Sequence, residues 1–95
     1  MEEEIRVRIP REGQILGVVE SLLGTNKLRV RCQDEKVRLC RIPGKMRKRL
    51  WLNQGTVVLV EPRPIKGDMR ADVVWKYRTA EVAVLRKKHI FTMHM

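Results

Sequence analysis

The sequence predicts an all-β fold: a barrel of five strands, with a short helix between the third and fourth strands and a C-terminal helix. Three observations support this prediction. Five short apolar or alternating segments are separated by turn residues. One segment with a helical pattern lies between the third and fourth of these predicted strands, and another follows the fifth strand. This order is the layout of an OB-fold barrel. An SH3-like barrel is the alternative, but it gives a weaker reason for the helical insertion.

The chain divides into an arm, a barrel and a C-terminal segment. Residues 1–12 form an N-terminal arm that we expect to be partly disordered, because Met1–Glu4 is acidic and Ile5–Ile9 is only a short alternating strand before Pro10. Such an arm can become ordered against a partner. Residues 13–78 are assigned to the OB-fold domain, and residues 79–95 to the C-terminal helix and tail.

The first half of the barrel contains three predicted strands, which are Ile15–Leu23, Leu28–Cys32 and Val37–Ile42. Gly17 lies inside the first strand, where glycine often marks a bulge or a bend. Gly24-Thr25-Asn26 forms the first turn. Gln33–Lys36 forms the second, and Asp34 and Glu35 are predicted to be its two central residues.

A two-residue turn fixes the pairing of this hairpin. Side chains opposite one another would then be Cys32 and Val37, Val30 and Leu39, and Leu28 and Arg41 on one face, with Arg31 and Arg38, and Arg29 and Cys40, on the other. The first face is mostly aliphatic and the second is basic. Like charges placed opposite one another destabilise a sheet, so phosphates are expected to lie across the second face.

The second half of the chain alternates helices and strands. The predicted elements are a helix over Lys45–Leu52, a turn at Asn53–Gly55, a strand over Thr56–Glu61 that ends at Pro62 and Pro64, a loop at Lys66–Asp68, a strand over Ala71–Tyr77 and a helix over Thr79–Lys88. Thr79 is predicted to cap the last helix, and its final turn is basic. His89–Met95 shows no clear pattern.

Positive charge is the most pronounced feature of the composition. The chain has 21 Lys and Arg residues against 11 Asp and Glu residues, a net charge of +10. Such a charge implies an anionic partner, and nucleic acid is the leading candidate. A membrane surface has less support, because the sequence contains no basic helix with a broad apolar face.

The charge is densest in Arg41–Trp51, RIPGKMRKRLW. Four cations follow Pro43-Gly44 within a few residues: Lys45, Arg47, Lys48 and Arg49. A run of one sign repels itself and is tolerable when a polyanion supplies the missing charge. We therefore expect this segment, a short helical turn on a loop, to enter the phosphate surroundings of an RNA. The alternative is a solvated basic surface that touches nothing.

Other chemistry has little support. Neither Cys32 with Cys40 nor His89 with His94 has the spacing of a zinc site, and the predicted hairpin places the cysteines on opposite faces. A reducing cytoplasm is therefore expected, with no cofactor. No nucleotide-binding loop or transmembrane segment is present in the sequence. Ion pairs and turns account for the carboxylates Glu20, Glu61, Asp68 and Asp72, so the chain is not expected to be an enzyme.

The aromatic residues Trp51, Trp75, Tyr77 and Phe91 are few for a protein that stacks bases along a groove. Trp75 alternates with Val73 and Tyr77, which favours a place in the core. Trp51 is either a stacking residue or an anchor for the predicted helix. Charge and shape therefore favour a folded RNA over a free strand.

Much of the chain resembles the archaeal translation initiation factor 1A family, to which eukaryotic initiation factor 1A and bacterial initiation factor one are related. The resemblance lies in IRVRIPREGQILGVVESLLG, LRVRCQDEKVRLCRIPGKMRKRLWLNQGTVVLVEP and KGDMRADVVWKY. It implies an OB fold that binds the small ribosomal subunit at the A site, near the decoding helix, and helps to assemble the initiation complex, block premature elongator tRNA entry and select the start codon. A generic single-stranded RNA-binding protein or RNA chaperone of cold-shock type is the alternative.

The resemblance also implies which residues contact RNA. They are Arg6, Arg8 and Arg11 in the arm, Arg29, Arg31, Arg38 and Arg41 on the sheet, and Lys45, Met46, Arg47, Lys48 and Arg49 in the basic segment. Trp51, which the resemblance does not assign, is added as a candidate because it could stack a base at the end of that segment. The expected partners are small-subunit RNA, A-site proteins, other initiation factors and, indirectly, initiator tRNA and mRNA. The protein is expected to be a monomer. Eukaryotic members end in a long acidic tail that contacts the subunit-joining GTPase, whereas this chain ends in HIFTMHM, which weighs against that contact.

Overall fold

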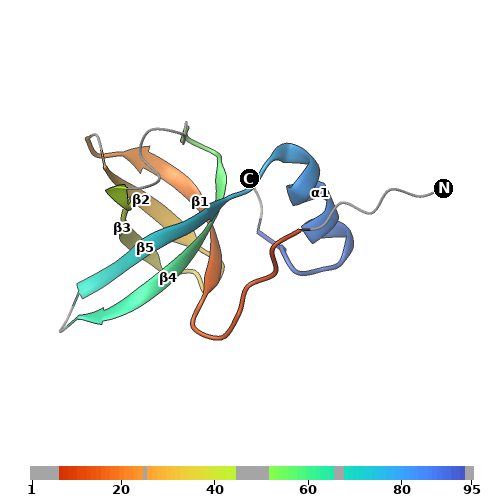
Figure 1. The fold of residues 1–95 in the computed structure, drawn as a ribbon, viewed down its shortest axis with the longest axis horizontal. Helices are drawn as coiled ribbons and strands as arrows, with labels where there is room; N and C mark the ends of the chain where they lie inside the picture. Colours follow the sequence, from red (N-terminus) through yellow and green to blue (C-terminus); the bar gives the residue numbers. More distant parts are fainter. Residues whose placement is uncertain (1–6, 25, 45–51, 66–67, 94–95) are drawn as a thin grey trace.

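A computed structural model of the protein describes residues 7–24, 26–44, 52–65 and 68–93. The elements are β1 (Ile15–Leu22), β2 (Lys27–Cys32), β3 (Val37–Arg41), β4 (Val57–Ile65), β5 (Asp68–Lys76) and α1 (Thr79–Lys87). The strands form a closed barrel in the order β1-β2-β3-β5-β4, and α1 lies beside one end of it (Figure 1). Only β3 and β5 pair in parallel among the described strands. The predicted OB-fold barrel is confirmed.

The predicted helix Lys45–Leu52 falls almost wholly on residues 45–51, which lie outside the described residues. Leu52 is described and belongs to no helix or strand. It is buried, as is Ile42 on the other side of the segment, and both belong to one core cluster with Val30, Val58 and Val60. The two ends of the basic segment are therefore fixed to the interior of the barrel.

Gly17 allows β1 and β2 to approach closely. It pairs with Cys32, and a Cβ atom on it would lie 2.5 Å from Val30 Cγ1 and 3.0 Å from the carbonyl oxygen of Arg31. The prediction of a bulge or bend at Gly17 is wrong in its position, because the register shift in β1 falls between Val19 and Ser21. The role of Gly17 is close packing.

The predicted register of the β2–β3 hairpin is wrong by one residue. Val30 pairs with Arg38 and Leu28 with Cys40, whereas Arg31 pairs with Val37. The loop is longer than a two-residue turn: the Cys32 N–H donates to the Lys36 carbonyl at 2.8 Å, which leaves three residues between them. Glu35 ends this loop with a φ of 70°, the left-handed conformation of a three-residue hairpin loop.

This shift changes the surroundings of two predicted residues. Arg38 and Cys40 lie on the inner face with Val30 and Leu28, so the predicted opposition of Arg31 and Arg38 does not exist. The prediction that the two cysteines point to opposite faces is also wrong. Cys32 and Cys40 are both buried, in the same core cluster, and both thiols are free.

The β4–β5 hairpin is longer than predicted. β4 continues through Pro62 and Pro64 to Ile65, which pairs with Asp68 at the start of β5. The predicted end of the strand at the prolines is therefore wrong. β1 pairs with β4 only as far as Val60, so beyond this point β4 has β5 alone as a partner, and proline is tolerated where a strand has an open edge.

The C-terminal segment closes one end of the barrel. The predicted helix is present as α1, but its N-cap is Arg78 rather than Thr79, and the Arg78 N–H donates to Glu81 Oε1 at 2.9 Å. The chain then turns back, and Phe91, only 1% exposed, packs with Leu16, Leu59 and other members of a second core cluster. Gln33 holds this segment: its amide donates to the Ile90 carbonyl at 2.9 Å and accepts from the Thr92 N–H at 3.0 Å.

Candidate nucleic-acid interface

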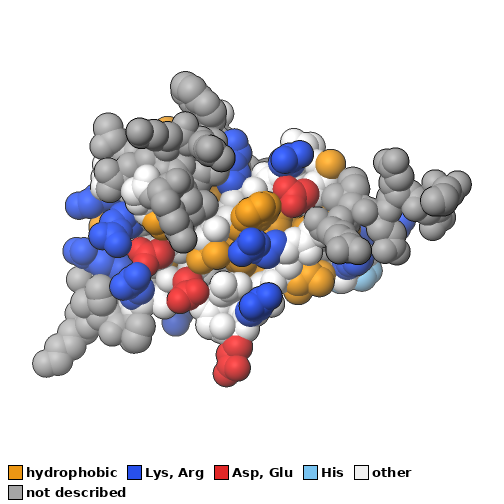
Figure 2. Space-filling model, viewed as in Figure 1, with side chains coloured by type: hydrophobic (Ala, Val, Ile, Leu, Met, Phe, Trp, Pro, Cys, Tyr) orange, Lys and Arg blue, Asp and Glu red, His pale blue; other side chains and the backbone are white. Residues whose placement is uncertain are grey.

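Cations gather on the outer surface of β2, β3, β5 and β4. Along β2, exposed and buried residues alternate strictly, so Leu28, Val30 and Cys32 enter the core and the residues between them face solvent. We define the basic face by its six exposed cations, which are Lys27, Arg29, Arg31, Arg41, Arg63 and Arg70. Figure 2 shows several Lys and Arg side chains on the part of the barrel that lies away from α1, with acidic side chains among them.

Strand pairing brings these side chains into rows. One row crosses the sheet as Lys27, Arg41, Asp72 and Glu61, and the next as Arg29, Leu39, Arg70 and Arg63. Residues that pair directly on one face have Cβ atoms about 5 Å apart. Cations from four strands therefore share one surface, which suits the closely spaced phosphates of a folded RNA.

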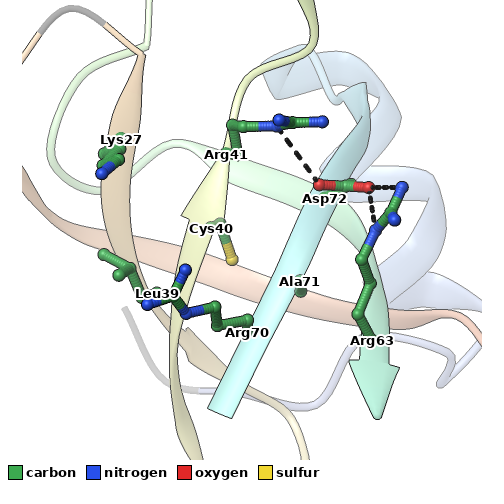
Figure 3. Close-up of a pocket in the computed structure, with 8 residues that line it drawn as sticks. All are labelled: Lys27, Leu39, Cys40, Arg41, Arg63, Arg70, Ala71 and Asp72. Carbon is green, nitrogen blue, oxygen red and sulfur yellow. Dashed lines mark hydrogen bonds and ion pairs between the residues drawn. The ribbon is translucent and has the colours of Figure 1, made fainter. Parts of the chain in front are cut away.

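A hollow of about 170 Å³ lies among four of the six cations of the basic face (Figure 3). Its lining is Lys27, Leu39, Cys40, Arg41, Arg63, Arg70, Ala71 and Asp72. Asp72 contacts two arginines: Arg41 Nε lies 3.8 Å from Oδ1, and Arg63 binds Oδ2 through Nε and Nη2. The predicted explanation of Asp72 by ion pairing agrees with these contacts.

The structure brings together three of the four arginines predicted on the sheet. Arg29, Arg31 and Arg41 lie on the basic face, whereas Arg38 is buried on the inner side. Arg38 donates to both carboxylate oxygens of Asp34, from Nη1 at 3.0 Å and from Nη2 at 2.8 Å. The prediction that Arg38 belongs to the basic surface is wrong, because the one-residue shift turns its side chain inward.

Arg38 and Asp34 instead form a structural ion pair. The hydrogen bonds from Arg38 lower the pKa of Asp34, and a backbone hydrogen bond from Lys36 adds to this effect, against some desolvation. The Arg38 side chain is 10% exposed and that of Asp34 31%. Removing the carboxylate would thus leave a nearly buried cation without this partner.

We expect Asp34→Asn to lower the free energy of unfolding by about 1–2 kcal/mol at pH 7, because a nearly buried charge loses its partner while the site stays partly open to water. A carboxylate with a lowered folded pKa contributes stability above its unfolded pKa, and this is lost as pH falls through the folded pKa. Urea unfolding at pH 7 and at pH 2–3 should therefore show a difference between variant and parent that shrinks in acid. Glu35→Gln, in the same loop, is the control and should have no effect. An equal loss at both pH values would contradict the ion pair.

Two of the predicted arm residues, Arg8 and Arg11, lie in the region of Trp75 and Glu81, the latter in α1. The Arg8 guanidinium stacks on the Trp75 ring, 4.4 Å from its centroid, and the Arg8 carbonyl accepts a hydrogen bond from the Tyr77 hydroxyl. Burial raises the pKa of Tyr77 to about 12, with Glu81 adding to the shift. Arg11 is exposed in the same region. Neither arginine joins the basic face, and Arg6 lies outside the described residues.

The basic segment starts from the edge of this face. Lys45, Met46, Arg47, Lys48, Arg49 and Trp51 lie outside the described residues. Arg41 is on the basic face, and the next residue, Ile42, is buried with its N–H donating to the Asn26 carbonyl at 2.9 Å. The residue directly before this segment's Pro43-Gly44, Ile42, is thus fixed in the core beside the exposed Arg41.

The sequence interpretation missed three members of the basic face: Lys27, Arg63 and Arg70. Lys27 continues the alternation of Arg29 and Arg31, so extending that pattern by one step would have found it. Arg63 and Arg70 pair across the β4–β5 hairpin. The interpretation ended β4 at Pro62, which removed Arg63 from the sheet.

The described part of the chain offers no other obvious chemistry. Within it, no three His, Cys, Asp or Glu side chains are grouped as a metal site, and no helix is long and apolar enough to cross a membrane. Burial raises the pKa of the Cys40 thiol to about 12, which keeps it protonated and unreactive. The basic face is therefore the best-supported site.

Comparison with known proteins gives a consistent result. Residues 3–94 match the family described as translation initiation factor 1A / IF-1. Translation initiation factor 1A of Methanothermobacter thermautotrophicus is 51% identical over 87 residues, covering 92% of this chain and 88% of the relative. That of Methanopyrus kandleri is 51% identical over 83 residues, covering 87% and 74%. The solution structure of translation initiation factor one from the Wolbachia endosymbiont of Brugia malayi has a TM-score of 0.54 at 22% identity, covering 76% of this chain and 85% of that one.

Proposed function

The chain belongs to the translation initiation factor 1A / IF-1 family, so its role lies in translation initiation, and we propose that it acts by binding the small ribosomal subunit at the A site. In this proposal it occupies the decoding region, promotes assembly of the initiation complex and supports start-codon selection. Its partners are small-subunit RNA, A-site proteins and other initiation factors, with initiator tRNA and mRNA contacted indirectly. It works as a monomer in the cytoplasm. Its relatives are initiation factors, a family not known as enzymes.

One observation carries the proposal: the basic face includes Arg41, directly before the buried Ile42, and Leu52, the first described residue after residues 45–51, is buried with Ile42. Ile42 and Leu52 fix the two ends of the segment in one core cluster. Arg41, directly before Ile42, belongs to the face that also holds Arg29 and Arg31. In this proposal the cations of the basic face and those of the sequence between Ile42 and Leu52 bind one RNA surface. A folded RNA, with phosphates in fixed positions, gains most from the preformed cations of the basic face.

The aromatic residues disfavour a generic single-strand binder. In residues 52–65 and 68–93, Tyr77 and Phe91 are buried, and Trp75 is partly buried beneath Arg8. A protein that binds free strands needs exposed rings on which successive bases stack. The cold-shock-type alternative therefore depends on Trp51 alone, which lies outside the described residues.

Co-sedimentation with purified archaeal small ribosomal subunits tests the proposal. We expect the protein to pellet with small subunits and to be displaced when a tRNA occupies the A site, because the two ligands share one location. Binding to an unstructured oligonucleotide of equal length should be weaker by more than about tenfold, since the cations match fixed phosphate positions. Tight binding to the oligonucleotide would favour the chaperone alternative. Undiminished binding beside an A-site tRNA would contradict the proposed location.

A further inference from the structure

We propose that Asp72 is a positioning residue that holds Arg41 and Arg63 in place for a backbone phosphate of the bound RNA. This inference rests on the proposed function and assigns a ligand, a phosphate oxyanion, to the hollow in the basic face. Asp72 is the acidic member of the hollow's lining, and the cations around it are Lys27, Arg41, Arg63 and Arg70. A carboxylate among these cations repels phosphates, so its presence on a surface proposed to bind RNA needs a physical explanation.

The contacts of Asp72 supply the reason. Its side chain is 17% exposed, whereas those of Arg41 and Arg63 are 60% and 58% exposed. The carboxylate is thus the sheltered partner, and it contacts the two long side chains through opposite oxygens, Oδ1 for Arg41 and Oδ2 for Arg63. An exposed arginine loses side-chain conformational freedom when a ligand fixes it. Holding two arginines before binding reduces that cost.

The geometry leaves donors available to the ligand. Arg41 approaches Asp72 through Nε, so neither of its Nη groups is committed to this carboxylate, and Figure 3 shows the Arg41 guanidinium beside Asp72 with a single dashed line between them. Arg63 uses Nε and Nη2, so its Nη1 is not committed to Asp72 either. A guanidinium carries five N–H donors, enough to bind a carboxylate and a phosphate together. Leu39, Cys40 and Ala71 complete the lining between the cations.

Two accounts of Asp72 predict opposite effects of Asp72→Asn on the affinity for RNA. If only the net charge of the basic face mattered, Asp72→Asn would remove a repulsive charge and strengthen RNA binding. If Asp72 positions the two arginines, the same change weakens binding although the protein becomes more positive. Glu61 is the matched control, because it is an exposed acid that pairs with Asp72 across β4 and β5. For Glu61→Gln, both accounts predict unchanged or tighter binding.

The experiment measures affinity for purified archaeal small ribosomal subunits at a fixed salt concentration, using the full chain labelled at its N-terminus. We expect Asp72→Asn to bind about tenfold more weakly than the parent. We expect the same of Arg63→Lys, which keeps the positive charge but loses the planar guanidinium that donates two parallel hydrogen bonds. In an Arg41→Ala, Arg63→Ala background, Asp72→Asn should have no further effect, because it acts through those arginines. If Asp72→Asn lowers the melting temperature, Arg63→Lys tests the same contact with the carboxylate still in place.

Three results are decisive. Weaker binding by Asp72→Asn and Arg63→Lys, with binding by Glu61→Gln intact, supports the positioning role. Equal or tighter binding by Asp72→Asn overturns it while leaving the proposed function in place, because the parent protein still binds. Failure of the parent protein to bind small subunits overturns the proposed function itself.

Discussion

Replacing Arg47 and Lys48 by glutamate is expected to weaken binding to the small ribosomal subunit by about a hundredfold or more. In the proposed complex, each substitution would remove one phosphate contact and put a repulsive charge in its place, and a contact of this kind contributes on the order of 1 kcal/mol at moderate salt. The slope of log affinity against log salt should fall as well, from about −3.5 for roughly five phosphate contacts to about −2 for three. Co-sedimentation across a salt series measures both quantities.

The matched control changes the charge by the same amount elsewhere. Lys87 and Lys88 are exposed at the end of α1, so Lys87→Glu with Lys88→Glu gives the same net charge as the first variant. It is expected to bind within about threefold of the parent, since charges beyond a Debye length of about 10 Å are screened. Equal losses in the two variants would show that net charge alone matters, and the basic segment would lose its special role.

Replacing Phe91 by alanine is expected to lower the free energy of unfolding by about 3–5 kcal/mol. Phe91 is 1% exposed and packs with Leu16, Leu59 and Leu85, so the substitution leaves a cavity between the barrel and α1. Its ring also faces Arg86, whose guanidinium lies 4.7 Å from the ring centroid. A domain of this size is stable by only about 5–15 kcal/mol, so the loss is a large fraction of the total.

Urea unfolding followed by far-ultraviolet circular dichroism measures this effect. Phe91→Leu keeps most of the volume and is expected to cost less than the alanine variant. Ile9→Ala is the surface control, because Ile9 is 51% exposed, and it should change stability by less than about 0.5 kcal/mol. A loss below about 1 kcal/mol for Phe91→Ala would mean that the C-terminal segment does not complete the core.

The order of the elements was the part of the fold most accessible from the sequence. Alternation in Leu28–Cys32 and the β-branched run after Thr56 each reflect a strand with one buried face, and this signal is local. Arg86 and Lys87 in the last turn of α1 likewise mark a helix end. The predicted element order therefore needed no long-range information.

Register was less accessible, because it depends on a single loop residue. The segment Gln33–Lys36 suits a two-residue turn or a three-residue loop. A two-residue type I′ turn would need a positive φ at both Asp34 and Glu35, whereas only Glu35 has one. That difference moved Arg38 and Cys40 from one face to the other. The assignment of Arg38 to the RNA surface failed for this reason, although Arg29 and Arg31 were assigned correctly to the outer face.

Long-range packing was not accessible at all. Phe91 and Gln33 are far apart in the sequence, and neither lies in a periodic pattern that reveals the contact between Gln33 and Ile90. The hollow around Asp72 was equally hidden, because it needs β3 and β5 to pair in parallel. The sequence predicted ion pairing for Asp72 but gave no partners.

The most direct measurement is a hydroxyl-radical footprint of small-subunit RNA with the parent protein and with the Arg47→Glu, Lys48→Glu variant. The account predicts that the parent protects backbone positions in the decoding region of the A site. The variant should lose this protection at concentrations where the Lys87→Glu, Lys88→Glu control retains it. Protection elsewhere on the subunit, or the same decoding-region footprint from the charge-reversed variant, would contradict it.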